Sequence, residues 1–159
     1  MSPKPPPKSG PRRAAPKRPT PKPKIPAQRA PQTAVSADAV NLVRTKGTAA
    51  RGGGPGGEAW RIDAEGGRAG TVFINWIDEP PVGQHASIQI YLNKPNQGRG
   101  IGRIGYRRAV EASQYEVVYA HMRKSNVASR RAAEAAGFVE EPRPGHPQLL
   151  MVWRRPKSR

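Results

Sequence analysis

The sequence predicts an α/β domain, in which helices flank a mixed β-sheet, preceded by a basic tail that has no core of its own. Three observations support this fold class. The composition changes near residue 57, three strand-like segments follow between residues 59 and 93, and helical and strand-like segments then alternate up to residue 155. A helix that crosses over between two strands requires a parallel pair, so we expect the sheet to be mixed.

Residues 1–57 are predicted to be a disordered tail, rich in Pro, Lys and Arg, that ends in a glycine-rich linker at residues 52–57. The formal net charge of the chain is +17, and twelve of its 28 Lys and Arg lie in this segment beside a single acid, Asp38. Because large apolar side chains are rare here, burial cannot offset the entropy of ordering. Only residues 33–51 are expected to contribute a short helix, and the domain is expected to span residues 58–159.

The composition also excludes several classes of protein. The sequence contains no apolar run as long as a membrane-spanning helix, and its first residues lack the apolar segment of a secretory signal. It contains no cysteine, which excludes a disulfide, thiolate metal ligands and a cysteine nucleophile. We therefore expect a cytoplasmic protein that uses no metal and makes no contact with a membrane.

The first half of the domain is predicted to contain three strands. Residues 59–64 have the pattern of a short strand, and residues 70–77 are rich in β-branched and aromatic residues, which is typical of a buried strand. A turn over residues 78–83 leads to residues 86–93, where apolar and polar residues alternate. The apolar face of this third strand consists of Ala86, Ile88, Ile90 and Leu92.

The second half of the domain is predicted to alternate helix and strand. Apolar residues recur at helical spacing over residues 101–113, and residues 116–122 form the next strand. A second helix over residues 126–138 ends at Gly137, the residue type that helices prefer just after their last turn. Residues 148–155 form the closing strand.

The segment "NQGRGIGRIG" at residues 96–105 contains two overlapping glycine motifs. Gly100, Gly102 and Gly105 match the G-x-G-x-x-G of dinucleotide-binding folds, whereas Gln97, Gly100 and Gly102 match Q-x-x-G-x-G, a different phosphate loop. A dinucleotide site requires a glycine directly after a strand, an acid at the end of the next strand and a doubly wound sheet. This sequence meets none of these requirements.

The second motif fits its surroundings, because it lies between an alternating strand and the start of a helix. Free backbone N–H groups and the positive end of the helix dipole bind phosphate at such a position, and glycines allow a close approach. Arg99 and Arg103 add positive charge. One alternative is a plain glycine-rich connection into the helix, and another is a loop that holds the phosphates of a nucleic acid.

A further motif lies in the second predicted helix, which carries Asn126, Ser129, Glu134, Gly137 and Phe138. Together with the glycine loop, it resembles the GNAT superfamily of acetyl-CoA-dependent N-acetyltransferases. The phosphate loop of that family reads Q/R-x-x-G-x-G/A, and its second motif reads N-x-x-S/A followed by G-F. The spacing is most similar to the ribosomal-protein N-terminal acetyltransferase branch. The resemblance covers residues 60–155.

The resemblance implies acetyl-CoA as co-substrate and assigns parts of the cofactor to parts of the chain. The strand before the loop would pair with the pantetheine arm, the loop would hold the pyrophosphate, Asn126 would bond the pantetheine, and Ser129 would face the sulfur. The cofactor-binding residues implied in this way are Ile90, Tyr91, Leu92, Gln97, Gly98, Arg99, Gly100, Ile101, Gly102, Asn126 and Ser129.

The reaction implied by the resemblance is direct attack of a neutral amine on the thioester, with a donor for the departing thiolate. Many family members use a tyrosine of the second helix as that donor. Ala133 stands at the matching position here, so Ser129 becomes the candidate, unless its hydroxyl bonds its own helix. Candidate bases are Glu79 with its neighbour Asp78, and His121, whose ordinary pKa suits proton transfer. A water chain is the alternative to any of them.

The acceptor side departs from the family. Its members begin with a strand and one or two helices that build the acceptor pocket, and here the basic tail occupies that place. We expect a domain reduced at its N-terminal side, which leaves a homodimer open as the source of the missing wall. Residues 1–51 are expected to contact rRNA or another nucleic acid weakly, through counterion release. A non-catalytic acyl-CoA-binding module and a basic nucleic-acid-binding or ribosome-binding protein are the alternatives to the enzyme.

Overall fold

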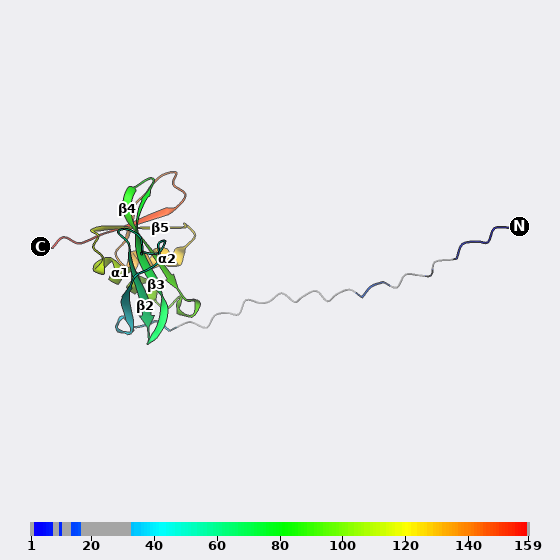
Figure 1. Cartoon of the computed structure of the whole chain (residues 1–159), viewed down its shortest axis with the longest axis horizontal. Coiled ribbons are helices and arrows are strands. Elements are labelled where there is room, and N and C mark those ends of the chain that lie inside the picture. Colours follow the sequence, from blue (N-terminus) through cyan, green and yellow to red (C-terminus); the bar gives the residue numbers. More distant parts are fainter. Residues whose placement is uncertain (1, 8–9, 11–13, 17–32, 159) are drawn as a thin grey trace. The chain divides into compact units, whose positions relative to one another are not determined.

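The computed structural model describes residues 2–7, 10, 14–16 and 33–158 (Figure 1). The chain divides into two units, Met1–Ala30 and Pro31–Arg159. In the first unit the described residues are exposed and belong to no helix or strand. The predicted disorder of residues 17–32 lies outside the described residues.

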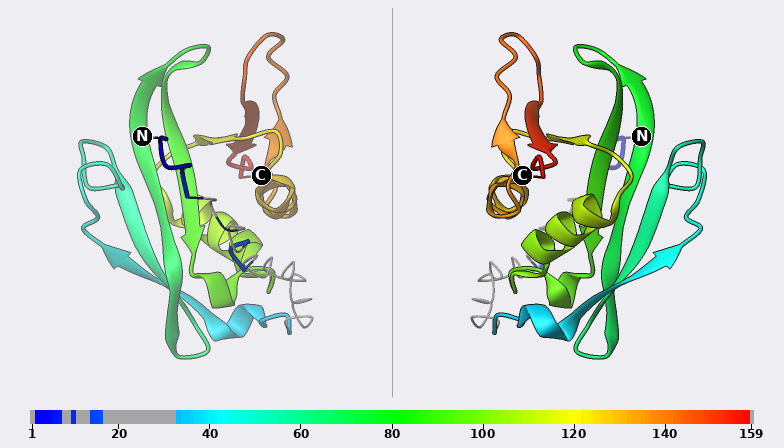
Figure 2. Two further views of the ribbon diagram at one scale, coloured as in Figure 1. Left: turned by 90° about the vertical axis from the view of Figure 1, so that its right-hand side faces the viewer. Right: turned by 90° about the vertical axis from the view of Figure 1, so that its left-hand side faces the viewer.

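The second unit is built on one seven-stranded sheet in the order β1-β2-β3-β4-β5-β7-β6. Its strands are β1 (Val40–Thr45), β2 (Glu58–Ala64), β3 (Gly67–Glu79), β4 (Gly83–Leu92), β5 (Val117–Met122), β6 (Val139–Glu140) and β7 (Leu149–Arg154). Its helices are α1 (Ile101–Ala112) and α2 (Val127–Ala135), with single 3-10 turns η1 (Ala37–Ala39) and η2 (Lys94–Asn96). Figure 2 shows α1 and α2 on the same side of the sheet.

The sheet is mixed, as predicted. Strands β4 and β5 run parallel and are joined by the crossover helix α1, whereas the other neighbouring strands are antiparallel. The α/β fold class is therefore confirmed. Among the helices of the described chain, none is long and apolar enough to cross a membrane.

The hairpin between β3 and β4 is tighter than the sequence predicts. We expected a turn over residues 78–83, but β3 continues to Glu79 and pairs it with Gly83, so the turn itself occupies only residues 80–82. Gly83 has a φ of 87°, a conformation that glycine adopts without steric cost. Asp78 and Glu79 therefore belong to a strand.

A strand stands where the sequence predicts, at most, a short helix. Within residues 33–51 the structure contains the turn η1 and then β1, whose Val40 and Leu42 face the core while Asn41 is exposed. All six residues of β1 pair with β2. The sheet thus begins before residue 58, where the sequence places the start of the domain. Alternation of buried and exposed residues over a short segment suffices for an edge strand, because its neighbour β2 supports it.

The glycine-rich segment 52–57 is a fixed turn in the structure, where the sequence predicts a flexible linker. Gly52 N donates to Asn75 Oδ1 at 2.8 Å, and Asn75 Nδ2 donates to the carbonyl of Ala50, also at 2.8 Å. A Cβ at Gly52 would lie 2.2 Å from the carbonyl oxygen of Glu58. The glycines here allow backbone segments to approach one another closely.

The main core lies between the sheet and the two helices. Ile62, Ile74 and Ile88 project from the strands toward Ile101 and Val110 of α1, and all five are almost fully buried. The apolar face predicted for β4 is confirmed, and its last two members, Ile90 and Leu92, are only partly covered. This incomplete cover marks the position of the site.

Candidate functional site

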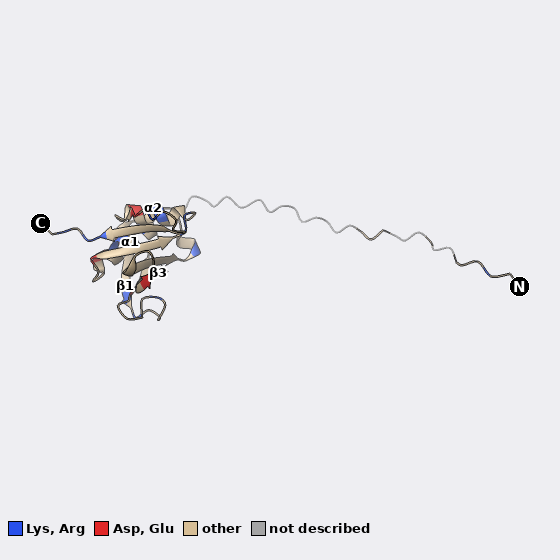
Figure 3. Ribbon diagram, turned by 90° about the horizontal axis from the view of Figure 1, so that it is seen from above, with Lys and Arg blue, Asp and Glu red and all other residues tan. Residues whose placement is uncertain are grey.

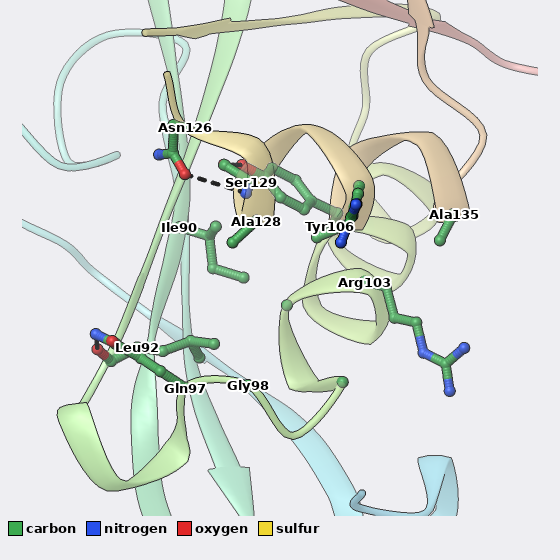
Figure 4. Close-up of a pocket in the computed structure, with 14 residues that line it drawn as sticks. Ile90, Leu92, Gln97, Gly98, Arg103, Tyr106, Asn126, Ala128, Ser129 and Ala135 are labelled. Atoms are coloured by element: carbon green, nitrogen blue, oxygen red, sulfur yellow. Dashed lines mark hydrogen bonds between the residues drawn. The ribbon is translucent and has the colours of Figure 1, made fainter. Parts of the chain in front are cut away.

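A cavity of about 590 Å³ opens beside the end of β4, on the side of the sheet that carries the helices (Figure 4). Strand β4 contributes Ile90 and Leu92 to its wall, and the remaining wall comes from the glycine loop and from both helices. Those remaining residues are Gln97, Gly98, Gly100, Gly102, Arg103, Tyr106, Asn126, Ala128, Ser129, Arg131, Ala132 and Ala135. The wall therefore combines apolar side chains of β4 and α2 with glycines of the loop and two arginines, Arg103 and Arg131.

Strands β4 and β5 separate at the cavity. They pair at only two positions, Ala86 with Val118 and Ser87 with Tyr119, although β4 continues to Leu92. Beyond Ser87, β4 keeps its hydrogen bonds to β3 on one side, while no described strand pairs with it on the other. Apart from the carbonyl of Leu92, which accepts from Gln97 Nε2 at 3.2 Å, the end of β4 thus offers free backbone groups to a ligand in the cavity.

The glycine loop presents the N-terminus of α1 to the cavity. Gly98 and Gly100 have φ values of 74° and 80°, which side chains other than glycine rarely adopt. Gly100 is the N-cap of α1, and no side chain of the described residues caps the helix there. The first N–H groups of a twelve-residue helix therefore remain available for an anion, with Gly102 and Arg103 also on the cavity wall.

Three of the predicted cofactor-binding side chains point away from the cavity. Arg99 donates to the carbonyl of Thr33 at 3.0 Å and pairs with Glu65 at 2.8 Å. Ile101 is fully buried, and Tyr91 lies on the other face of β4, as side-chain alternation requires. The structure brings the other predicted residues to the cavity wall, namely Ile90, Leu92, Gln97, Gly98, Gly100, Gly102, Asn126 and Ser129.

The start of α2 closes the far end of the cavity. Asn126 is the N-cap, and its Oδ1 accepts from the backbone N–H of Ser129 at 3.2 Å (Figure 4). The Ser129 hydroxyl lies 3.0 Å from the hydroxyl of Tyr106, which comes from α1. In the described part of the chain Ser129 Oγ bonds no backbone group, so the self-bonded alternative is not the arrangement observed.

Tyr106 is a cavity residue that the sequence analysis did not single out. Only 3% of its surface is exposed, and burial raises the pKa of its phenol above the ordinary value, although the hydrogen bond with Ser129 opposes this effect. The only signal in the sequence is an aromatic residue with a polar tip on the apolar face of a helix that directly follows a phosphate loop.

The other catalytic candidates lie in a histidine cluster outside the cavity wall. His121 Nε2 on β5 lies 2.8 Å from Nε2 of His85, a buried residue of β4 that the sequence analysis also missed. Burial and the proximity of His85 lower the pKa of His121, while the carboxylate of Glu79 acts in the opposite direction. Ser129 thus lines the cavity, whereas His121 lies with His85 outside the cavity wall, and Glu79 acts on His121 through its charge.

Figure 3 shows charged residues distributed over strands and helices. Ion pairs such as Arg107 with Glu111 and Arg130 with Glu134 neutralise part of the positive charge. Arg130 of α2 pairs with Glu134 at 3.0 Å and with Glu140 at 3.3 Å, whereas its neighbour Arg131 lines the cavity. The two arginines therefore differ in role. Among the described residues, no group of three or more His, Asp or Glu side chains is placed to hold a metal ion.

Comparison with known proteins identifies the family. Residues 22–139 match the acetyltransferase (GNAT) domain family. No curated protein matches the chain. Similar solved structures share 18–23% identity with it, which shows a common fold.

Three of these structures illustrate the likeness. A putative acetyltransferase from Salmonella typhimurium, yncA with acetyl-CoA, is 18% identical with a TM-score of 0.52 over 62% of this chain and 65% of its own. Mycobacterium smegmatis RimJ with CoA-disulfide is 20% identical with a TM-score of 0.50 over 62% of this chain and 53% of its own. AAC(6')-Ib with paromomycin and acetyl-CoA is 20% identical with a TM-score of 0.55 over 67% of this chain and 68% of its own.

The chain spans less than two thirds of the first two of these structures. The family match, in contrast, covers most of the chain and both walls of the cavity up to the end of α2. The protein therefore belongs to the GNAT acetyltransferase domain family.

Proposed function

We propose that this domain binds acetyl-CoA and transfers its acetyl group to an amine by direct attack in a ternary complex. The observation that carries the proposal is the cavity itself, which joins a free strand edge, an uncapped helix N-terminus and a hydroxyl pair in one continuous wall. These three features suit the amide-bearing arm, the pyrophosphate and the thioester of acetyl-CoA. Family membership and the bound cofactors of the similar structures support it.

The proposed cofactor site uses the predicted residues whose side chains or backbone reach the cavity. The free backbone around Ile90 pairs with the amides of the pantetheine arm, and the carbonyl of Leu92 joins it when Gln97 Nε2 gives way. The N–H groups of residues 98–102 hold the pyrophosphate at the positive end of α1, and Arg103 and Arg131 add positive charge. We assign the side chain of Arg99 a structural role and no contact with the cofactor, because it already forms an ion pair with Glu65.

The proposed chemistry uses a hydroxyl for the leaving group and a base for the amine. Ser129 donates to the sulfur as the C–S bond breaks. His121 or Glu79 accepts the proton that the amine releases, directly or through water. A base with a lowered pKa is unprotonated near neutral pH. The lowered pKa of His121 therefore suits the role of a proton acceptor.

The identity of the amine that accepts the acetyl group is also part of this proposal. The similar structures include RimJ and an aminoglycoside acetyltransferase, so the acceptor class differs among proteins of this fold. We keep the ribosomal-protein N-terminal acetyltransferase branch as the first choice, because Asn126, Ser129 and Gly137 keep the spacing on which it rests. Nucleic-acid contact through residues 1–51, a homodimer and a cytoplasmic location stay predictions.

A thermal-shift titration with acetyl-CoA tests the cofactor site. A ligand that binds only the folded state at one hundred times its Kd adds about 2.7 kcal/mol of stability, which raises the Tm. Gly102→Glu places a carboxylate in the cavity without a positive φ, and Gly67→Glu adds the same charge in an open part of β3. We expect a Tm rise in the wild type and in Gly67→Glu, and none in Gly102→Glu. No rise in folded wild type would refute the proposal.

A thiol-release assay then separates an enzyme from a non-catalytic binding module. The acceptors are a peptide with a free N-terminus, spermidine and kanamycin, which represent an α-amine, a polyamine and an aminoglycoside. Release of CoA that depends on one acceptor supports the enzyme. Binding without release for any acceptor favours the module, and tight binding of RNA without binding of acetyl-CoA favours the nucleic-acid alternative.

A further inference from the structure

The hydroxyls of Tyr106 and Ser129 form a pair that joins the two helices inside the cavity. Their oxygens are 3.0 Å apart, Tyr106 comes from the middle of α1, and Ser129 comes from the first turn of α2. The ring of Tyr106 also packs edge-on against Phe138, with ring centroids 5.6 Å apart. Packing and burial therefore fix the position of the phenol oxygen.

The direction of the hydrogen bond between Tyr106 and Ser129 follows from which of the two hydrogens would otherwise be buried without an acceptor. In the described chain, Ser129 Oγ is the only group that bonds the Tyr106 hydroxyl. If Ser129 donated to Tyr106, the phenolic hydrogen of this buried residue would lack a protein acceptor, which costs free energy. Donation by Tyr106 avoids this cost. The Ser129 hydrogen is then free to point into the cavity, because Ser129 Oγ already accepts from Tyr106.

We propose that Tyr106 is a positioning residue that holds the Ser129 hydroxyl as a donor toward the leaving sulfur of acetyl-CoA. This inference rests on the proposed function. The sequence has Ala133 where many family members carry a tyrosine on the second helix, and here a tyrosine hydroxyl reaches the same cavity from the first helix. Burial keeps this phenol protonated and able to donate.

The assigned role fits the balance of the reaction. The amine nitrogen forms a bond to the acetyl carbon, the C–S bond breaks, and its electron pair goes to sulfur. The amine releases one proton to a base or to water, so the products are the amide, the CoA thiolate and the protonated base. Ser129 donates a hydrogen bond to the thiolate as its charge develops, while the bond from Tyr106 keeps that hydroxyl in place.

The pKa of the CoA thiol bound to the enzyme tests this role without an acceptor. A donor aimed at the sulfur stabilises the thiolate and lowers this pKa. A pH titration measures it, because the ultraviolet absorbance of the thiolate reports the fraction of CoA that is ionised at each pH. The variants are Tyr106→Phe, Ser129→Ala and both together, with Tyr115→Phe as a control that removes a hydroxyl bonded to Gly56. Calorimetric titration with CoA first establishes that each variant binds it.

We expect the pKa of the bound thiol to rise by about one unit in Tyr106→Phe and in Ser129→Ala, and to stay unchanged in Tyr115→Phe. Because Tyr106 acts through Ser129, the double variant should equal Ser129→Ala. Equal thiol pKa values in wild type and Tyr106→Phe, or additive effects in the double variant, would overturn the inference and leave the proposed function intact. A folded wild type that does not bind CoA would overturn both.

Discussion

The Nε2 atoms of His85 and His121 lie 2.8 Å apart, which fixes the tautomers of both rings when both are neutral. His85 Nδ1 lies 2.7 Å from the carbonyl of Gly83, so it donates there and leaves its Nε2 as an acceptor. His121 must then donate from Nε2 and keep its lone pair on Nδ1. His121 can therefore accept a proton at Nδ1 without breaking the bond to His85.

We expect the stability of the domain to depend on pH through His121. Burial and His85 lower the pKa of His121 in the folded state, with smaller effects of Glu79, which raises it, and of His146, which lowers it. Below about pH 6.5 the unfolded chain then binds the proton more readily than the folded chain, so acidification destabilises the fold.

Urea denaturation between about pH 5 and pH 8 checks this dependence. His121→Asn should lose stability less steeply than the wild type below about pH 6.5, and the two curves should run parallel above it. Parallel curves over the whole range would show that His121 does not contribute.

Gly70→Ala should destabilise the sheet next to the cavity. A Cβ at Gly70 would lie 2.0 Å from the carbonyl oxygen of Tyr91 and 3.0 Å from the Cα of Leu92, and backbone cannot move aside as a flexible side chain can. We expect a loss of about 2–3 kcal/mol in chemical denaturation. Gly67→Ala, in the same strand but with its nearest atom at 3.9 Å, is the control and should change stability by less than about 0.5 kcal/mol.

Asn75→Ala should loosen the glycine-rich turn that the sequence presents as a linker. Asn75 makes two hydrogen bonds of 2.8 Å, to the backbone of Gly52 and of Ala50. We expect a loss of about 1–3 kcal/mol and faster hydrogen exchange at the amide of Gly52. Asn41→Ala, an exposed change on β1, should leave that exchange rate unchanged. An unchanged rate in Asn75→Ala would mean that other contacts hold the turn.

Arg155→Lys should cost about 1–2 kcal/mol, although it keeps the charge. The Arg155 guanidinium donates to four carbonyls at the end of α1 and just after it, those of Val110, Glu111, Ser113 and Tyr115. A lysine ammonium cannot reach this set from one position. Arg154→Lys, which alters an exposed 3.8 Å pair with Glu141, should be neutral within about 0.5 kcal/mol in the same denaturation experiment. Equal effects of the two variants would contradict the capping role.

Much of the fold could be predicted because local patterns carry it. The alternation in β4, the helical spacing in α2 and Gly137 after that helix each depend on a few neighbouring residues. The glycine loop is equally local, since its residues act through their own backbone. For these reasons the sequence predicted both the elements around the cavity and most of its wall.

The remaining features depend on contacts between distant residues. Tyr106 meets Ser129 because α1 packs on α2, and His85 meets His121 because β4 and β5 are neighbours in the sheet. Strand β1 was missed because its six residues become a strand only where β2 pairs with them. A glycine-rich sequence such as residues 52–57 can form either a flexible linker or a tight turn. The contacts with Asn75, which the sequence does not reveal, show that it forms the turn here.

The separation of β4 from β5 gives this protein a sheet edge in its interior, with a neighbouring strand and two helices close by. An edge of this kind selects by polarity as well as by shape. A narrow molecule with amide groups at strand-like spacing can pair with the backbone there, whereas an alkyl chain of the same width would leave those polar groups without partners. We therefore expect the backbone of β4 to disfavour a fatty chain, which brings no hydrogen-bond donor or acceptor to this edge.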